Sequence, residues 1–502
     1  MLELKILPNF LKEKSHDKST LPTLLKKWIK ELSLPERSAL LSENFLETIA
    51  CCFEELSAPS LTDKLFRDTL KNRVKPSIPE GIAKPVSSAH GKIKTLFLCF
   101  PKDDKTKKYN FFSLFKELVE KMDTVEKFIV IYHETEFNND GIIPRIHANN
   151  NRICPIHLKD GDLGLIPWMQ DLFYPIEYDN KIHLVASQRY RTDEIRALSK
   201  ILEDNFGTDV RPEDQLLLTK TVLPFEGGNI LVGKNFILIG EDSKSLLEVN
   251  YEATYQQWFG SNPIFLSSEW ELPSKTPLIF DNSKNTLPRF SEKQPLLHLD
   301  LFISLAGFNQ QGEYILVIGE PVLGEPLYPD PTNKDLNLFF DWFNNVRNAI
   351  NDIIRQLKQQ TSIDFQIIRN PLVLTYEDDC DTSNTRNWMW ATYNNCLVEI
   401  IENESKQITS KKVWLPSYGS KQADYSEYTM PYKTKQEIAQ TMDFPTHTVG
   451  FGNWCNLRKY DLQNQSIWSD LGFEVCLLEN NYIPLAKDRG SLNCITNCVQ
   501  RG

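Results

Sequence analysis

The feature that most constrains the fold is the alternation of short apolar runs with amphipathic segments beyond about residue 90. An apolar run at 95–100 (TLFLCF) is followed by an amphipathic stretch at 109–122 and by a second apolar run at 127–133 (KFIVIYH). Short apolar runs are typical of buried strands, whereas apolar residues spaced three and four apart are typical of a helix that packs on a sheet. This order predicts a β-α-β unit.

Further apolar runs predict strands along the rest of the chain. They lie at 182–186, 229–240, 277–280, 297–307, 313–320, 396–401, 412–416 and 473–479. One long amphipathic segment, 336–360, predicts a helix among them. We therefore expect an α/β domain, although periodicity alone does not tell how the strands close and no repeat is evident in the sequence.

The first 90 residues have a different pattern, which predicts a separate region. Apolar residues at 20–72 recur at spacings of three and four, and Pro76, Pro79 and Pro85 then interrupt the pattern. We expect residues 1–90 to form a helical N-terminal region with a proline-bearing linker, and residues 91–502 to form the main domain. Packing against that domain is the simplest role for these helices; docking a protein substrate and dimerisation are the alternatives.

Composition and charge exclude several classes of protein. A net charge of -11 argues against a nucleic acid as the main ligand, because phosphate binding needs a dense basic surface. The N-terminus shows no secretory segment and no apolar run reaches the length of a membrane span, so we expect a soluble protein. The ten cysteines lack the regular spacing of a disulfide framework, which favours reduced thiols in a cytoplasmic compartment.

Phosphate-binding and metal-binding motifs find little support. The segment GGNILVG lacks the G-x-G-x-x-G spacing and no P-loop motif occurs, so nucleotide binding is not expected. Cys494 and Cys498 form a C-x-x-x-C pair without a second Cys or His pair near it, which is weak support for zinc. The acidic run from Glu377 to Asp381 lacks the spacing of an EF-hand loop and fits a solvated turn.

Four other segments together contain one set of chemically useful side chains. Asp171 lies in PWMQDLFYP, and Glu226 precedes two glycines in PFEGGNILVG. In LLHLDLFISLAG, His298 and Asp300 are two residues apart, so on a strand they would point to the same face. Cys494 lies eight residues from the end of the chain.

This set matches the needs of chemistry at a guanidinium group. A guanidinium is planar and permanently charged, so a site must hold it with carboxylates that match its N–H donors. Attack at its central carbon needs a nucleophile such as a cysteine thiolate, and histidine can protonate the departing ammonia and then activate water. The bound cation can itself lower the cysteine pKa.

Each residue also has a simpler structural explanation. Asp171 could be a helix N-cap, and His298 could be a core histidine with Asp300 as its hydrogen-bond partner. Cys494 could be a small buried apolar residue, and Gly227-Gly228 could form a hairpin turn. The shared order and context of the four segments favour the functional interpretation.

Read together, the segments resemble the guanidino-group modifying enzymes, and most of all the peptidylarginine deiminase catalytic domain. Residues 168–171 (WMQD) resemble the family's W-I-Q-D segment, and residues 298–300 (HLD) resemble H-V-D. Residues 490–497 (GSLNCITN) resemble G-E-V-H-C-G-T-N, whereas the EGGN segment is more similar to the free-arginine and agmatine branches. The resemblance covers about residues 93–502 and implies a five-bladed, pseudo-symmetric α/β propeller, the pentein fold.

The resemblance also implies roles. Cys494 would be the nucleophile, His298 the acid and base, and Asp171 and Asp300 the guanidinium clamp. The resemblance adds candidates for substrate contact, which are Trp168, Gln170, Glu226, Asn493 and either Arg189 or Arg191. The expected reaction converts an arginine guanidinium, free or within a protein, to a ureido group and ammonia.

Two departures from the family pattern lead to further expectations. Asn493 stands where many members have histidine, which bears on substrate binding or rate. Leu172 and Tyr174 stand where calcium-dependent members have acidic ligands, so we expect no cofactor and no calcium requirement, with the run from Glu377 to Asp381 as the one reservation. The alternatives are an amidinotransferase, which would pass the same intermediate to an amine, and a catalytically weak propeller that binds a partner protein.

Overall fold

The computed structural model describes most of the chain beyond residue 82. The described ranges, apart from single residues 180, 203, 257, 297 and 481, are 83–100, 111–133, 151–158, 168–186, 202–206, 215–220, 225–240, 255–259, 263–267, 296–324, 334–360, 363–379, 385–419 and 450–502. All of them belong to one compact unit, residues 79–244 and 252–502. The predicted helices at 20–72 and the predicted strand at 277–280 lie outside the described residues.

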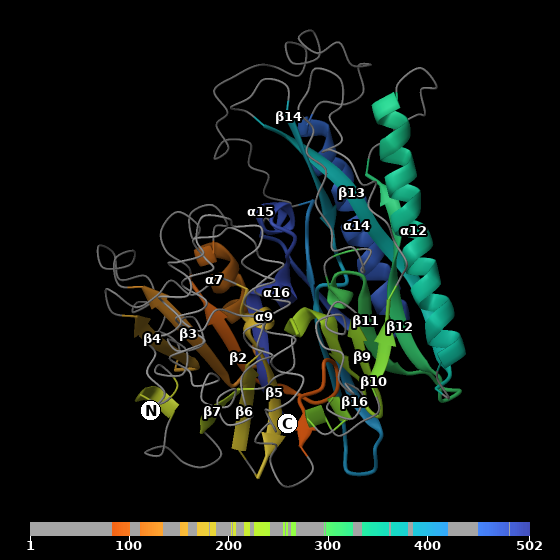
Figure 1. The fold of residues 1–502 in the computed structure, drawn as a ribbon. Helices are drawn as coiled ribbons and strands as arrows, with labels where there is room; N and C mark the ends of the chain where they lie inside the picture. The colour runs from red at the N-terminus through yellow and green to blue at the C-terminus, as the bar shows by residue number, and fades with distance from the viewer. Residues whose placement is uncertain are drawn as a thin grey trace, which may run out of the picture. The chain divides into compact units, whose positions relative to one another are not determined.

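The described strands form five sheets, interspersed with helices, so the fold is α/β (Figure 1). One sheet has the order β18-β2-β3-β4 and contains the strands Thr496–Arg501, Ile93–Cys99, Lys127–His133 and Ile153–Leu158. Helix α7 (Phe111–Lys121) connects β2 to β3, which pair in parallel. The predicted β-α-β unit is therefore confirmed.

The other four sheets are built in a similar way from three or four strands. The second, β1-β5-β6-β7, contains Lys84–Pro85, Phe173–Tyr178, Lys181–Ala186 and Leu216–Lys220. The third, β10-β9-β8, contains Pro263–Leu266, Ile237–Gly240 and Ile230–Val232. The fourth, β11-β12-β13-β14, contains Ile303–Phe308, Tyr314–Leu323, Phe365–Asp379 and Thr385–Ala391. The fifth, β15-β16-β17, contains Leu397–Glu402, Ile408–Pro416 and Glu474–Leu478.

Two long helices and one short one accompany these sheets. Helix α12 (Lys334–Gln360) precedes β13 and corresponds to the predicted helix at 336–360. Helix α14 (Gly450–Asp470) packs on β13 and β17, and the short α15 (Ile483–Lys487) follows β17. No helix of the described residues is long and apolar enough to cross a membrane.

Five strands, one from each sheet, line a common cavity, and we call β5, β8, β11, β15 and β18 the inner strands. The lining includes Tyr174 of β5, Leu231 of β8, Ser304 of β11, Val398 of β15 and Asn497 of β18. Because these strands come from all five sheets, each sheet contributes side chains to the same cavity.

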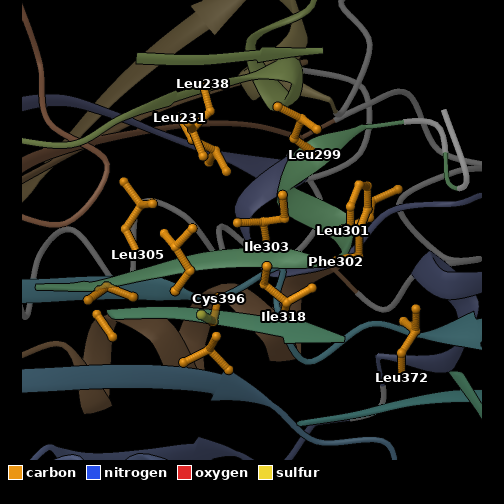
Figure 2. Packing of buried hydrophobic residues seen from close by; sticks show 14 of the residues in the cluster. Leu231, Leu238, Leu299, Leu301, Phe302, Ile303, Leu305, Ile318, Leu372 and Cys396 are labelled. Atoms are coloured by element: carbon orange, nitrogen blue, oxygen red, sulfur yellow. The ribbon is translucent and has the colours of Figure 1, made fainter. Parts of the chain in front are cut away.

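Buried apolar side chains hold the inner strands to their neighbours. Figure 2 shows part of one cluster, in which Leu231 and Leu238 of the third sheet lie near Leu299 and Ile303 at the start of the fourth. Burying apolar area of this kind is the main driving force for folding, at about 25 cal/mol per Å². The core therefore fixes the starting points of the inner strands relative to one another.

The structure corrects the predicted strand at 297–307. His298 has extended backbone, but Leu299–Leu301 form a 3-10 turn, η5, and strand β11 begins only at Ile303. His298 and Asp300 therefore do not lie on one face of a strand. Two of the simpler structural explanations do not hold either: the N-cap of the helix that holds Asp171 is Trp168, and Gly227–Asn229 form a 3-10 turn, η3, rather than a hairpin turn.

Candidate active site

Each inner strand is preceded by a short turn, and these five turns carry the candidate residues. The turns are helix α9 (Met169–Leu172), η3, η5, the turn at 392–396 and helix α16 (Leu492–Ile495). Each is closed by a backbone hydrogen bond: Asp171 N to Trp168 O, Asn229 N to Glu226 O, Leu301 N to His298 O, Asn395 N to Thr392 O, and Ile495 N to Ser491 O. Helix α9 contacts both α16 and η3, and η3 contacts η5. Asn395 Oδ1 of the turn at 392–396 accepts the Cys494 backbone N–H of α16, so the five turns meet at one place.

The His298 imidazole lies between two carboxylates at this place. Its Nε2 is 2.5 Å from Glu226 Oε2, and its Nδ1 is 3.7 Å from Asp171 Oδ1. His298 is 1% exposed, so both interactions occur away from bulk water. Burial alone would lower the His298 pKa, but the carboxylates of Asp171 and Glu226 outweigh it and raise the pKa well above its usual value. The imidazole is therefore suited to hold a proton and to donate it.

The Cys494 thiol is held by a buried carboxamide. Asn395 Nδ2 donates to Cys494 Sγ at 3.2 Å, and Asn395 Oδ1 accepts from the Cys494 backbone N–H at 3.1 Å. Burial and the Asp300 carboxylate raise the Cys494 pKa to about 12, against the opposing effect of the His298 imidazole. In the substrate-free site the thiol is therefore protonated, and a bound cation would favour the reactive thiolate.

Asp171 and Asp300 are the two acidic groups beside the thiol and the imidazole. Asp300 Oδ2 accepts hydrogen bonds from Asn395 Nδ2 and Asn493 Nδ2, each at 2.8 Å. Its other oxygen, Oδ1, and Asp171 Oδ1 are buried and accept no hydrogen bond from any residue that the structure describes. A buried carboxylate oxygen needs a donor, so a ligand rich in N–H groups would satisfy both.

Burial also makes these two carboxylates unusually easy to protonate. It raises the Asp171 pKa to about 7, assisted by the negative charges of Glu226 and Asp300 and opposed by His298. Burial raises the Asp300 pKa to about 6, although His298, Asn493 and Asn395 favour its ionised form. A bound cation would favour loss of both protons, so binding of a cation and ionisation of these two carboxyl groups are coupled.

Two glycines allow the η3 turn to approach the site closely. A Cβ at Gly228 would lie 2.7 Å from His298 Nδ1 and 3.0 Å from Asp300 Oδ1. A Cβ at Gly227 would lie 1.9 Å from the Gln170 carbonyl oxygen. The sequence E-G-G is thus required by space, because only glycine lets the Glu226 turn pack against both η5 and α9.

The remaining predicted contact residues occupy different places. Trp168 packs so closely on the backbone that precedes α16 that a Cβ at Gly490 would lie 2.3 Å from its ring. Gln170 is 9% exposed and lines the cavity formed by the inner strands, as does Asn493. Arg189 and Arg191 lie outside the described residues.

Two contacts were not foreseen from the sequence. Glu226, predicted to contact substrate, is a partner of His298, and Asn395 had no predicted role. The E-G-G pattern predicts that the backbone beside Glu226 packs closely against another part of the protein. It does not identify His298 as the residue that Glu226 contacts. Asn395 follows Asn394 directly before the predicted strand at 396–401, and such a pair is typical of an ordinary turn.

One group of side chains in the described part of the chain is close enough to be compared with a metal site. Ligand atoms of His298, Asp300 and Cys494 lie within 4.8 Å of one another. Asn395 already bonds two of the three groups, and among the described residues the set lacks the closed ligand shell of a structural zinc site. Of the acidic run from Glu377 to Asp381, the structure describes only backbone in β13, ending at Asp379.

Comparison with known proteins gives matches among solved structures. No protein-family model and no curated protein matches the chain. A crystal structure assigned as a peptidyl-arginine deiminase is 14% identical with a TM-score of 0.48, over 83% of this chain and 98% of that one. The agmatine deiminase of C. jejuni is 13% identical with a TM-score of 0.45, over 83% and 95%. An amidinotransferase from Microseira wollei is 9% identical with a TM-score of 0.35, over 83% and 97%. All three are guanidino-modifying enzymes by name, and the similarity is low, so the chemistry of this chain has to be inferred from its own side chains.

Proposed function

We propose that the protein is a cysteine-dependent deiminase that hydrolyses an arginine guanidinium to a ureido group and ammonia. One observation carries the proposal: a thiol, an imidazole and two carboxylates from three separate turns are buried together, and each carboxylate has one oxygen without a donor among the described residues. A planar cation with several N–H donors would satisfy those oxygens and would favour the thiolate. A guanidinium has these properties.

The first half of the proposed reaction releases ammonia. With the guanidinium held by Asp171 and Asp300, the Cys494 thiolate attacks the central carbon, and a C–S bond forms. His298 donates a proton to one terminal nitrogen, the C–N bond breaks and ammonia leaves. The raised pKa of His298 supports this role, because the imidazolium is then present at neutral pH. A thiouronium-type adduct on Cys494 remains.

The second half of the proposed reaction consumes water. His298, now neutral, takes a proton from a water molecule that attacks the adduct carbon. The C–S bond then breaks as the second proton of that water leaves to solvent, so the neutral ureido product departs and the Cys494 thiolate is restored. Glu226 holds the imidazole through Nε2 in both halves, which leaves Nδ1 on the side of Asp171 and the thiol.

We further propose that the five sheets are the blades of a propeller with the site on its axis. The five inner strands, one per sheet, line a single cavity, and the five turns that precede them meet at the site. This arrangement supports a pseudo-symmetric fold with five blades. It would also explain why the candidate residues are spread over more than 300 positions of the sequence, from Asp171 to Cys494.

The substrate is proposed as an arginine side chain in a protein or a small guanidino compound such as free arginine or agmatine. The acidic net charge of -11 favours such cationic ligands. We propose a reducing, cytoplasmic compartment, which is supported by six free cysteines among the described residues.

The test is a product assay on purified protein with free arginine, agmatine and an arginine-containing peptide. We expect ammonia and a ureido product in equal amounts from one of them, and none from the Cys494→Ala variant. Transfer of the amidino group to an added amine, which forms a new guanidino compound without release of ammonia, would indicate an amidinotransferase instead. No turnover of any substrate by folded protein would contradict both and favour the partner-binding alternative.

A further inference from the structure

Asn395 lies at the same position relative to its inner strand as two of the proposed functional residues. Asp171, Asn395 and Cys494 each lie two positions before the first residue of an inner strand, which are Phe173, Leu397 and Thr496. Asp171 and Asn395 each donate their backbone N–H to the residue three positions earlier, and Cys494 lies in the corresponding turn of α16. Three of the five turns thus deliver a polar side chain from an equivalent position.

The hydrogen bonds of Asn395 fix the orientation of its carboxamide. Oδ1 accepts the Cys494 backbone N–H at 3.1 Å, whereas Nδ2 donates to Asp300 Oδ2 at 2.8 Å and to Cys494 Sγ at 3.2 Å. The reverse orientation would place an oxygen against a carboxylate and an N–H against an N–H. Asn395 is 0% exposed, so water does not replace these partners.

The position of Nδ2 matters because the groups facing the sulfur are mostly unfavourable to a thiolate. Asp300 and Asp171 disfavour a negative sulfur, burial does so more strongly, and His298 acts in the opposite direction. A donor between two negative groups satisfies both and keeps them from facing each other directly. Among the described residues, Asn395 donates hydrogen bonds to both Asp300 and Cys494.

We propose that Asn395 is a further catalytic residue, whose Nδ2 group stabilises the Cys494 thiolate and holds it beside Asp300. The inference rests on the proposed function for its role in turnover. Its effect on the sulfur is independent of any substrate, because the contact is present in the substrate-free site. It can therefore be tested by the chemical reactivity of Cys494 alone.

The sharpest variant is Asn395→Asp, which retains an oxygen to accept the Cys494 backbone N–H and removes the donor to the sulfur and to Asp300. The matched control is Asn394→Asp, an isosteric change in the same turn. Asn394 is also buried, at 3% exposure, but its Nδ2 donates to Ser304 Oγ and Val317 O. Both variants lose a buried donor, and only one of them touches the nucleophile.

The measurement is the rate at which iodoacetamide alkylates Cys494 at one fixed pH, followed by fragment-ion mass spectrometry of the tryptic peptide 490–501, which separates Cys494 from Cys498. Below its pKa, a thiol whose pKa rises by one unit reacts about tenfold more slowly. We expect Asn395→Asp to react at least tenfold more slowly than wild type and Asn394→Asp to react within about twofold of it. Thermal unfolding of both variants reports on the fold.

The possible results separate the proposal from a purely structural role. Equal alkylation of Cys494 in wild type and in Asn395→Asp would overturn it, as would an equal loss in both variants. If Asn395→Asp does not fold, Asn395→Ala takes its place, with slower alkylation expected and an unchanged rate overturning the proposal. Because alkylation needs no substrate, a negative product assay would contradict the proposed function and leave this test intact.

Discussion

His298 Nε2 lies 2.5 Å from Glu226 Oε2, although the two residues belong to turns that precede inner strands of different sheets. His298 is buried and Glu226 is half-buried, and the carboxylates of Glu226 and Asp171 on the two sides of the ring favour the charged form of the imidazole. The protonation of His298 thus depends on residues that are 72 and 127 positions away in the sequence.

Glu226→Gln should lower the His298 pKa while preserving the shape of the site. Glutamine keeps a polar partner for Nε2 but removes one of the two charges that raise the pKa. The proposed reaction needs the imidazolium, so the alkaline limb of the kcat profile should move to lower pH, and kcat at pH 8 should fall at least about tenfold. The check is a pH–rate profile of both proteins, and an unchanged alkaline limb would contradict the role given to Glu226.

Binding of a guanidinium should depend on pH through the two clamp residues. The Asp171 pKa is about 7 and the Asp300 pKa is about 6 in the free site, so acid converts both to neutral groups that cannot pair with a cation. Affinity should therefore be low at pH 5, rise through pH 6 to 7 and level off above. Each protonated carboxyl should weaken binding about tenfold per pH unit below its pKa.

The binding measurement is calorimetric titration with an alkylguanidinium salt across this pH range. In Asp171→Asn the upper part of the rise should be absent, because asparagine does not titrate. An affinity that is flat from pH 5 to 8 in the wild type would show that these carboxylates are not the clamp.

Gly228→Ala should damage activity far more than stability. The added methyl group would lie 2.7 Å from His298 Nδ1 and 3.0 Å from Asp300 Oδ1, so one of them must move. Displacing a reacting group by a fraction of an ångström to 1 Å can cost on the order of a hundredfold in rate. We expect a loss of kcat/KM of that order in the product assay.

The matched control for that variant is Gly312→Ala. Gly312 has φ +86 and nothing within 4 Å of its added Cβ, so alanine there is strained by about 1 kcal/mol without touching the site. It should lower the free energy of unfolding in denaturant titration and leave kcat/KM unchanged. The same loss of activity in both variants would mean that general destabilisation, rather than the site, explains Gly228→Ala.

Removal of metal ions should leave activity unchanged. Leu172 and Tyr174 stand at the positions where calcium-dependent members of the family have acidic ligands. Leu172 packs in the apolar core, and Tyr174 donates its hydroxyl to Val86 O. Neither provides the carboxylate oxygens that calcium prefers. Turnover should be the same before and after dialysis against EDTA, whereas a loss that calcium alone restores would overturn the expectation.

Much of the α/β pattern could be predicted from apolar runs, and the exceptions have physical causes. The β-α-β unit, α12 and strands β12, β15, β16 and β17 were expected, because they are apolar and bounded by polar residues. Strand β13 contains Pro371 and β5 contains Pro175, which are unusual inside a sheet, and β18 is rich in polar residues. Helix α14 was missed because its apolar residues do not follow a single helical face.

The candidate site could likewise be predicted only in part. The sequence suggested which residue types belong together, because Cys494, His298 and the two aspartates form a coherent chemical set. It could not show that His298 and Asp300 lie in a 3-10 turn, or that Asn395 bonds the nucleophile across 99 positions. Those contacts depend on how the five sheets bring their turns together, and the sequence pattern within one segment does not predict that arrangement.

The most direct test of the central claim is to stop turnover with acid and measure the mass of the peptide that contains Cys494. During turnover of an active substrate, we predict that a fraction of Cys494 carries the mass of the substrate minus ammonia, and that Cys494→Ala carries no adduct and makes no product. Formation of ureido product without an adduct, at an undiminished rate in Cys494→Ala, would contradict the claim that this cysteine is the nucleophile.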